Sequence, residues 1–195
     1  MIAILVFTIG YTVALFSYGL KVESPLAFLY TGISTGLIIL FAVLHRWARW
    51  PSHALWAASL VGLGNMLGGV ILVSGQPLYM ADVVGPIGYD KVFHFAAAAG
   101  MTVLAWEAMK RWVGVGYHRG GILLFTWLVV NGGGAVVEIA ELIGSLLSDV
   151  SVGDYLNNAV DLVANALGAA FALPLVVWLD RSIPATTAPT GGERG

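Results

Sequence analysis

Long apolar stretches, separated by short polar segments, dominate the hydropathy pattern of this chain. Six such stretches occur, and each has about the 20 residues that an α-helix needs to cross about 30 Å of hydrocarbon. They cover approximately residues 2–20, 25–44, 52–74, 90–112, 122–147 and 154–179. The pattern therefore predicts an all-α integral membrane protein with six transmembrane helices.

The segments between the apolar stretches carry residues that end helices. Residues 75–89 contain two prolines and three glycines and no basic residue, and they form the longest predicted loop. The first stretch lacks a basic start and a cleavage site, so we expect a retained helix rather than a signal peptide. Residues 1–180 are predicted to form a single polytopic transmembrane domain, and residues 181–195 a disordered cytoplasmic tail.

Three adjacent glycines, Gly132 to Gly134, lie near the centre of the fifth apolar stretch. In a lipid environment, small residues allow two helix backbones to approach closely, and glycines also allow a helix to break locally. We therefore expect either a kink or a tight helix crossing at this position.

The composition agrees with the hydropathy pattern and excludes other classes of protein. Hydrophobic residues make up 58% of the 195 residues and charged residues only 10%, whereas about 25% is typical of soluble domains. Nine basic and eleven acidic residues give a net charge of -2, which provides no basic surface for nucleic acid. The chain has no cysteine, so disulfides and thiolate chemistry are excluded. The expected partner is the lipid bilayer, and nucleic acid is not expected.

The positions of the basic residues predict the orientation, because Lys and Arg are retained on the cytoplasmic side of short loops. With both termini in the cytoplasm, only Lys21 and Lys91 lie outside. The other basic residues then all lie inside: Arg46, Arg49, Lys110, Arg111, Arg119, Arg181 and Arg194. This asymmetry predicts a multi-pass protein of the cell (plasma or inner) membrane with both termini cytoplasmic.

Polar side chains inside the predicted spans are few, and they gather towards one end of the bundle. Ionisable groups are costly in a membrane, so they mark a functional site or a buried pair. Their spacing places each group on one helix face. The groups are Asp90 and His94 on the fourth span, Glu138 and Glu141 on the fifth, and Asp154, Asn158, Asp161 and Asn165 on the sixth. In the predicted topology, all three groups lie in the extracytoplasmic half of the bilayer.

One interpretation of this polar cluster is a divalent metal site, because carboxylates and an imidazole form an oxygen-rich ligand shell. The candidate ligands are Asp90, His94, Glu138, Glu141 and Asp161. A bound metal ion would lower the pKa of a water molecule and so allow hydrolysis of a lipid-linked or cell-envelope substrate. The catalytic candidates are then Glu138, Asp161 and His94, with Asp154, Asn158 and Asn165 in a substrate-binding or polar network.

Two other interpretations remain open at this point. The same residues would suit a non-enzymatic protein that transports or binds a small molecule or an ion, with His94 and a glutamate as titrating groups. They would also suit a purely structural network of hydrogen bonds between the last three helices. Whether the protein is an enzyme is therefore left undecided by these residues.

The candidate residues differ in how well an ordinary structural role explains them. For Asp90 and for Asp154, a role as a helix N-cap alone explains the residue as well as a functional role does. Glu138 and Asp161 lie two or more turns inside their helices, so capping cannot explain them, and they are the strongest candidates. The remaining histidines lie at predicted cytoplasmic ends and are not assigned as ligands: His45, His53 and His118.

Three ordered motifs resemble a known group of membrane proteins. They are Tyr89-Asp90-Lys91-Val92-Phe93-His94-Phe95, Glu138-Ile139-Ala140-Glu141 and Asp161-Leu162-Val163-Ala164-Asn165-Ala166-Leu167-Gly168-Ala169. Over about residues 25–175 the chain resembles the YjdF-like bacterial and archaeal membrane proteins and, more widely, the VanZ-like superfamily. The two glutamates of the middle motif match the YjdF-like pattern better than the VanZ-like pattern. The resemblance implies a shared fold, a site at these motifs and a link to the cell envelope.

The predicted topology can be tested by cysteine labelling, because the natural chain contains no cysteine. A cysteine introduced at Gly75 is expected to react with a membrane-impermeant maleimide added to intact cells. A cysteine at His118 is expected to react only after the membrane has been permeabilised. Labelling of position 75 only after permeabilisation would overturn both the topology and the outward position of the polar cluster.

Overall fold

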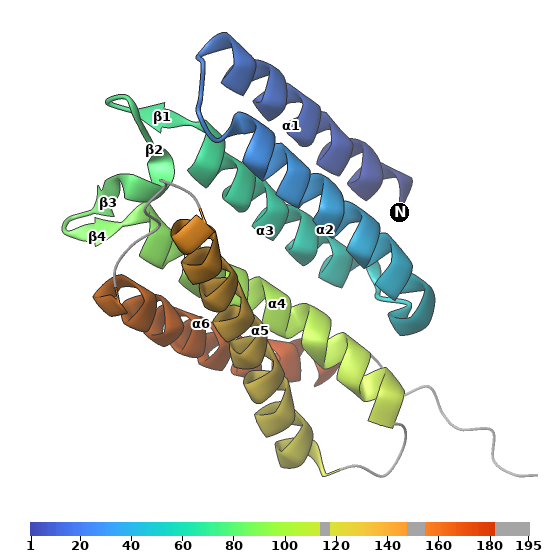
Figure 1. Ribbon diagram of the computed structural model, residues 1–195. Helices are drawn as coiled ribbons and strands as arrows, with labels where there is room; N and C mark the ends of the chain where they lie inside the picture. Colours follow the sequence, from blue (N-terminus) through green and yellow to red (C-terminus); the bar gives the residue numbers. More distant parts are fainter. Residues whose placement is uncertain (114–117, 148–154, 182–195) are drawn as a thin grey trace, which may run out of the picture.

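The computed structural model describes residues 1–113, 118–147 and 155–181, and these contain six α-helices (Figure 1). The helices are α1 (Ile2–Lys21), α2 (Ala27–Ala48), α3 (Ser52–Val70), α4 (Tyr89–Val113), α5 (Arg119–Leu147) and α6 (Tyr155–Arg181). The predicted turn before the sixth span, Asp154 and the predicted tail lie outside the described residues. The helical prediction is therefore confirmed for the described part of the chain.

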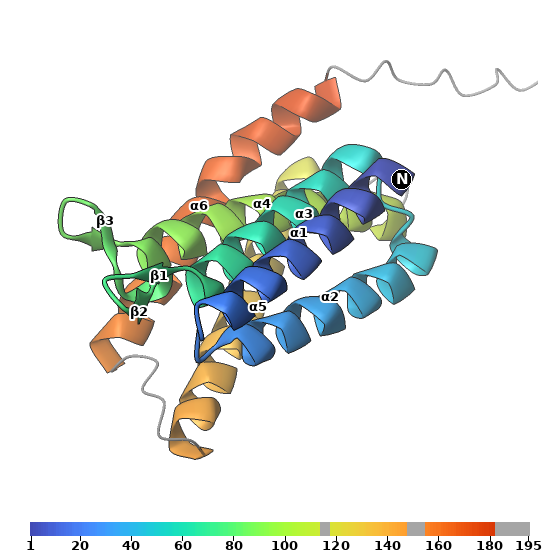
Figure 2. The same ribbon diagram turned by 90° about the horizontal axis from the view of Figure 1, so that it is seen from above.

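Helix α4 lies at the centre of the arrangement. It packs most extensively on α6, and it also contacts α3 and α5. Helices α1, α2 and α3 contact one another and lie on one side of α4, whereas α5 crosses α4 and α6 at a steep angle (Figures 1 and 2). We call the end of the bundle where α4 begins the site end, and the other end the opposite end. The N-terminus and the end of α6 both lie at the opposite end (Figure 2).

Five of the six helices, α1, α2, α4, α5 and α6, are long and apolar enough to cross a membrane. Large apolar side chains such as Phe28, Val136 and Phe171 are at least 65% exposed, as expected for a surface in contact with lipid. Helix α3 has 19 residues, but its small and polar residues make its most apolar stretch less apolar than those of the other five helices. One of these residues, Ser59, contacts α1 through a 2.6 Å hydrogen bond with Thr8.

The segment between α3 and α4 is more regular than the sequence pattern predicted. Helix α3 ends at Val70, four residues before the predicted end of the third span, and two short antiparallel hairpins follow where a loop was expected. The first pairs β1 (Leu72–Val73) with β2 (Gln76–Pro77), and the second pairs β3 (Asp82–Val84) with β4 (Ile87–Gly88), with the 3-10 turn η1 (Leu78–Met80) between them. Positive φ angles at Gly75 and Gly85 form the two turns, and β-branched residues beside such glycines favour hairpins.

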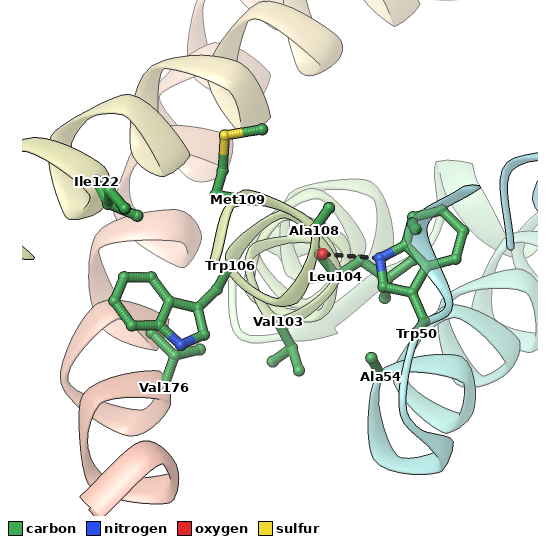
Figure 3. Packing of buried hydrophobic residues seen from close by; sticks show 10 residues of the cluster. Trp50, Ala54, Val103, Leu104, Trp106, Ala108, Met109, Ile122 and Val176 are labelled. Atoms are coloured by element: carbon green, nitrogen blue, oxygen red, sulfur yellow. Dashed lines mark hydrogen bonds between the residues drawn. The ribbon is translucent and has the colours of Figure 1, made fainter. Parts of the chain in front are cut away.

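An apolar core joins five helices, α2 to α6, towards the opposite end of the bundle (Figure 3). Trp106 of α4 is 1% exposed and packs in the same cluster as Val176 of α6 and Ala54 of α3. The indole of Trp50 donates a 2.9 Å hydrogen bond to the carbonyl of Leu104, so it buries its ring without leaving its N–H unsatisfied. This core holds the second half of α4 in place.

A charged cluster lies beyond this core at the opposite end. Lys110 of α4 lies 2.9 Å from Glu107 and 2.6 Å from Asp180 of α6. His53 of α3 lies 3.4 Å from Glu107, and Arg119 of α5 lies 3.6 Å from Asp180. These side chains are partly exposed, as expected for ion pairs in the interfacial region.

Two glycines allow the last three helices to approach closely. A Cβ atom at Gly168 of α6 would overlap the backbone of Phe95 of α4, and one at Gly134 of α5 would lie 2.7 Å from Asn165 Nδ2. Gly132 and Gly133 have no such neighbours, and α5 continues through all three glycines. The tight crossing expected here is therefore found at Gly134.

The Gly168→Ala variant is expected to lose about 1–3 kcal/mol of stability, because the added methyl group forces the two backbones apart. Gly133→Ala is the matched control, and it should be neutral or slightly stabilising because alanine is the better helix former. Thermal unfolding in detergent, followed by tryptophan fluorescence, measures both. Equal effects of the two variants would show that the α4–α6 approach does not limit stability.

Candidate functional site

The first turns of α4 carry the polar residues around which the candidate site is built. Helix α4 begins at Tyr89, so Asp90 lies inside the first turn and is not the N-cap. Asp90 Oδ1 lies 3.3 Å from Nε2 of His94, which is one turn further along the same helix. His94 is only 6% exposed. The expected pairing of these two residues on one helix face is therefore present.

Lys91 connects α4 to α6. Its Nζ atom lies 2.8 Å from Asp90 Oδ2 and 2.8 Å from Asp161 Oδ1, and it donates a 2.5 Å hydrogen bond to Asn157 Oδ1. Asn157 Nδ2 donates a 2.7 Å hydrogen bond to Asp161 Oδ2. Asp161 is fully buried. The ammonium group thus lies between carboxylates of two different helices.

Lys91 and Asn157 were not among the predicted site residues. Lys91 was used only as a basic residue on the extracytoplasmic side, and Asn158 was expected in the polar group of the sixth span in place of Asn157. One signal could have identified Lys91. A cation in the first turn of a helix faces the positive end of the helix dipole, so it calls for compensating carboxylates nearby.

The other side of the His94 ring faces α5 and α6. Nδ1 lies 3.5 Å from Glu138 Oε1 and 3.3 Å from Asn165 Oδ1. Glu138 is 4% exposed, and within the described part of the chain neither of its carboxylate oxygens has a hydrogen-bond partner. A buried carboxylate without hydrogen bonds is unusual and needs an explanation such as a catalytic role or a ligand.

The remaining candidates of the polar cluster lie further from its centre or cannot be placed. Glu141 is half-buried on α5, about one turn after Glu138. Asn158 is half-buried on α6 and makes none of the hydrogen bonds found between described residues. Asp154 lies outside the described residues. The structure therefore brings together Asp90, His94, Glu138, Asp161 and Asn165.

Three of these residues are spaced as the ligands of a metal ion would be. One ligand atom each from Asp90, His94 and Asp161 lies within 4.8 Å of the other two, and this is the one such group that the described residues contain. Metal–ligand distances of about 2.0–2.6 Å place ligand atoms at separations of this size. Glu138 and Glu141 are outside the group. Residues of two helices could therefore hold one cation.

A pocket of about 560 Å³ lies between the second hairpin and the first turns of α4 and α6. Its lining residues are Tyr79, Met80, Asp82, Pro86, Ile87, Gly88, Asp90, Lys91, Asn157 and Val160. Asp90 and Lys91 belong both to this lining and to the polar cluster. The pocket therefore connects the cluster to the outside of the site end.

Aromatic residues cover the side of the site that faces α2 and α3. The Tyr79 ring packs against those of Tyr30, Tyr89 and Phe93, with centroids 5.5–5.6 Å apart. The Tyr79 hydroxyl donates a 2.9 Å hydrogen bond to Asn65 Oδ1, and burial raises the pKa of this phenol well above its ordinary value. Tyr79 is therefore a neutral donor that fixes η1 over α3.

On the inner side, apolar residues separate the site from the opposite end. Ala98 lies one turn after His94 on α4, and it packs with Val130 of α5 and Ala169 of α6. All three are less than 9% exposed. The candidate site thus opens towards the site end and is closed towards the opposite end.

The Lys91–Asp161 pair should stabilise the protein strongly, because removing one partner of a buried ion pair costs about 3–5 kcal/mol. Asp161→Ala is expected to lower the unfolding temperature more than Asp180→Ala. Asp180 pairs with Lys110 in the same way, but its side chain is 22% exposed compared with 1% for Asp161, so water screens the attraction within that pair. Thermal unfolding in detergent compares the two, and an equal or smaller loss for Asp161→Ala would contradict this account.

Comparison with known proteins agrees with the membrane character of the fold. No curated protein and no solved structure matches the chain significantly. A family model described as "Predicted membrane protein (DUF2238)" matches residues 3–182. This match includes all six helices and every residue of the polar cluster. The chain therefore belongs to the DUF2238 family of membrane proteins.

Proposed function

We propose that the protein binds a divalent cation through Asp90, His94 and Asp161, and uses it in chemistry on a lipid-linked or cell-envelope substrate. The observation that carries this proposal is the set of three ligand atoms within 4.8 Å of one another, next to the buried Glu138 carboxylate, which accepts no hydrogen bond from any residue that the structure describes. Oxygen and imidazole ligands of this kind suit Mg²⁺, Mn²⁺ or Zn²⁺.

The residues around the proposed cation have complementary roles. A bound divalent cation would lower the pKa of a coordinated water molecule. Glu138 Oε1 lies 3.5 Å from Nδ1 of His94, on the side of the ring away from Asp90, so it would hold the imidazole in the tautomer that binds the cation through Nε2. Asp161 and His94 hold the cation, and Asn165 orients the imidazole through the 3.3 Å contact with its Nδ1.

The pocket suits a substrate that reaches the site from the membrane surface. Its volume of about 560 Å³ lies within the range of about 300–1,000 Å³ typical of small-molecule sites. A lipid headgroup would enter beside the second hairpin, next to Asp90 and Lys91. In the proposed orientation this end faces the extracytoplasmic side, and both termini are cytoplasmic. The motifs that resemble YjdF-like and VanZ-like proteins are the ones that supply these residues.

The apolar contacts among Ala98, Val130 and Ala169 favour a one-sided site over a transport pathway. A transporter needs access from both faces of the membrane, and a polar route through this layer would require the three helices to separate. The close approach of α4 and α6 at Gly168 opposes such a separation.

Metal binding to the purified, chelator-treated protein tests the proposal. Titration with Mn²⁺, followed by electron paramagnetic resonance, is expected to give saturable binding of about one ion per chain. His94→Ala and Asp161→Asn remove ligands, and each should weaken binding by more than about 100-fold, the upper range for loss of an outer-shell partner. Glu138→Gln should keep the stoichiometry, because Glu138 lies outside the ligand group.

Glu107→Gln is the matched control, because it removes a partly buried carboxylate of α4 that pairs with Lys110 at the opposite end. It should leave Mn²⁺ binding unchanged. Gel filtration verifies that each variant remains folded. The absence of saturable binding to the wild-type protein, or equal binding by the control and the ligand variants, would exclude the proposed site and favour a structural network.

A further inference from the structure

We propose that Lys91 competes with the divalent cation for its site: the ammonium group binds the Asp90 and Asp161 carboxylates, and the arriving cation displaces it into the pocket. This inference rests on the proposed cation site. It adds a residue that sets the affinity of that site, and it makes cation binding and the ion pairs of Lys91 with Asp90 and Asp161 mutually exclusive.

The geometry requires such a competition. Lys91 Nζ lies 2.8 Å from one oxygen of Asp90 and 2.8 Å from one oxygen of Asp161, and both residues belong to the ligand group. A cation held between these two carboxylates and His94 would therefore lie next to the ammonium group. Because repulsion between like charges is strong where water is scarce, the ammonium and the cation cannot share the site.

The charges of the surrounding side chains favour an exchange. Lys91 neutralises Asp90 and Asp161 only in part, since it supplies one positive charge for two carboxylates. The buried Glu138 carboxylate, which has no hydrogen bond among the described residues, adds a third carboxylate, and His94 lies between it and Asp90. A divalent cation supplies twice the charge of the ammonium that it would replace in this set.

The pocket provides the space into which Lys91 would move. Lys91 already lines the pocket, and its side chain is 21% exposed. Asp82 also lines the pocket and is exposed, so a displaced ammonium would find a carboxylate and water there. The flexible stem of lysine allows this movement without a change in α4.

Binding of Mn²⁺ to Lys91→Met tests the competition. Methionine keeps much of the apolar stem but removes the charge, so the variant should bind Mn²⁺ at least about tenfold more tightly than the wild-type protein. A tenfold gain corresponds to a wild-type protein in which Lys91 leaves the carboxylates free in about one tenth of the molecules, because the apparent affinity falls in proportion to the fraction of molecules able to bind. Lys91→Arg, which keeps the charge, should not gain affinity.

Lys110→Met is the matched control. Lys110 also links a carboxylate of α4 to one of α6, at the opposite end, where the described residues contain no group of metal ligands. Its removal should leave the dissociation constant of Mn²⁺ unchanged. An equal gain for Lys110→Met and Lys91→Met would overturn the inference, because it would show a general effect of lost positive charge.

A second measurement uses the wild-type protein and does not depend on a variant that folds. The chain has three lysines, Lys21, Lys91 and Lys110, so mass spectrometry can follow the reductive methylation of each. At constant pH, saturating Mn²⁺ should increase the methylation rate of Lys91 several-fold and leave that of Lys110 unchanged.

The outcomes separate this inference from the proposed function. Saturable Mn²⁺ binding to the wild-type protein with no change in Lys91 methylation, or with unchanged or weaker binding to Lys91→Met, overturns the competition but leaves the cation site intact. No binding to either protein overturns the cation site itself. Binding to Lys91→Met that is much tighter than to the wild-type protein supports both.

Discussion

Charge neutralisation inside the bundle is the constraint on which the arrangement of the last three helices depends. Asp161 is fully buried in α6, and an ion of this kind is tolerated only with a partner and further hydrogen bonds. Lys91 of α4 supplies the partner, and Asn157 supplies a hydrogen bond. The side chains can meet because Gly168 lets the α4 and α6 backbones approach closely. A larger residue at position 168 would weaken the packing and the ion pair together.

The interior of the bundle is organised along α4 as two charged ends with an apolar middle. At the opposite end, the Lys110 cluster is partly exposed and links α4 to α6. At the site end, the Lys91 cluster is more buried and includes His94 and Glu138, whose carboxylate has no hydrogen bond from the described residues. The two clusters use the same kind of contact, but only the second contains a fully buried ion-pair partner, Asp161. Stability alone explains the first cluster, whereas Glu138 gives the second a feature that stability does not require.

The two hairpins between α3 and α4 lie between this buried polar cluster and the outside of the bundle. Tyr79, held by its hydrogen bond to Asn65, fixes η1 against α3 and closes one side of the site with aromatic rings. The second hairpin leaves a pocket over Asp90 and Lys91. A buried charged cluster that opens through this pocket is suited to a reaction or a binding event at one membrane face. The apolar layer below His94 keeps that event separate from the other face.

The sequence by itself determined the helices and most of the buried polar residues. Apolar stretches of spanning length predict helices, since the backbone must satisfy its own hydrogen bonds in lipid, and helical spacing placed Asp90 with His94 and Asp161 with Asn165. Only the tertiary structure decided which charges meet. Lys91 joins the cluster because α6 lies beside the first turn of α4. Asn157, rather than the expected Asn158, takes part because it lies on the face of α6 that packs towards Lys91. The two hairpins likewise went unpredicted, because strands of two or three residues leave no periodic pattern. Sequence spacing reports which residues share a face of one helix, whereas the packing of the helices decides what that face meets.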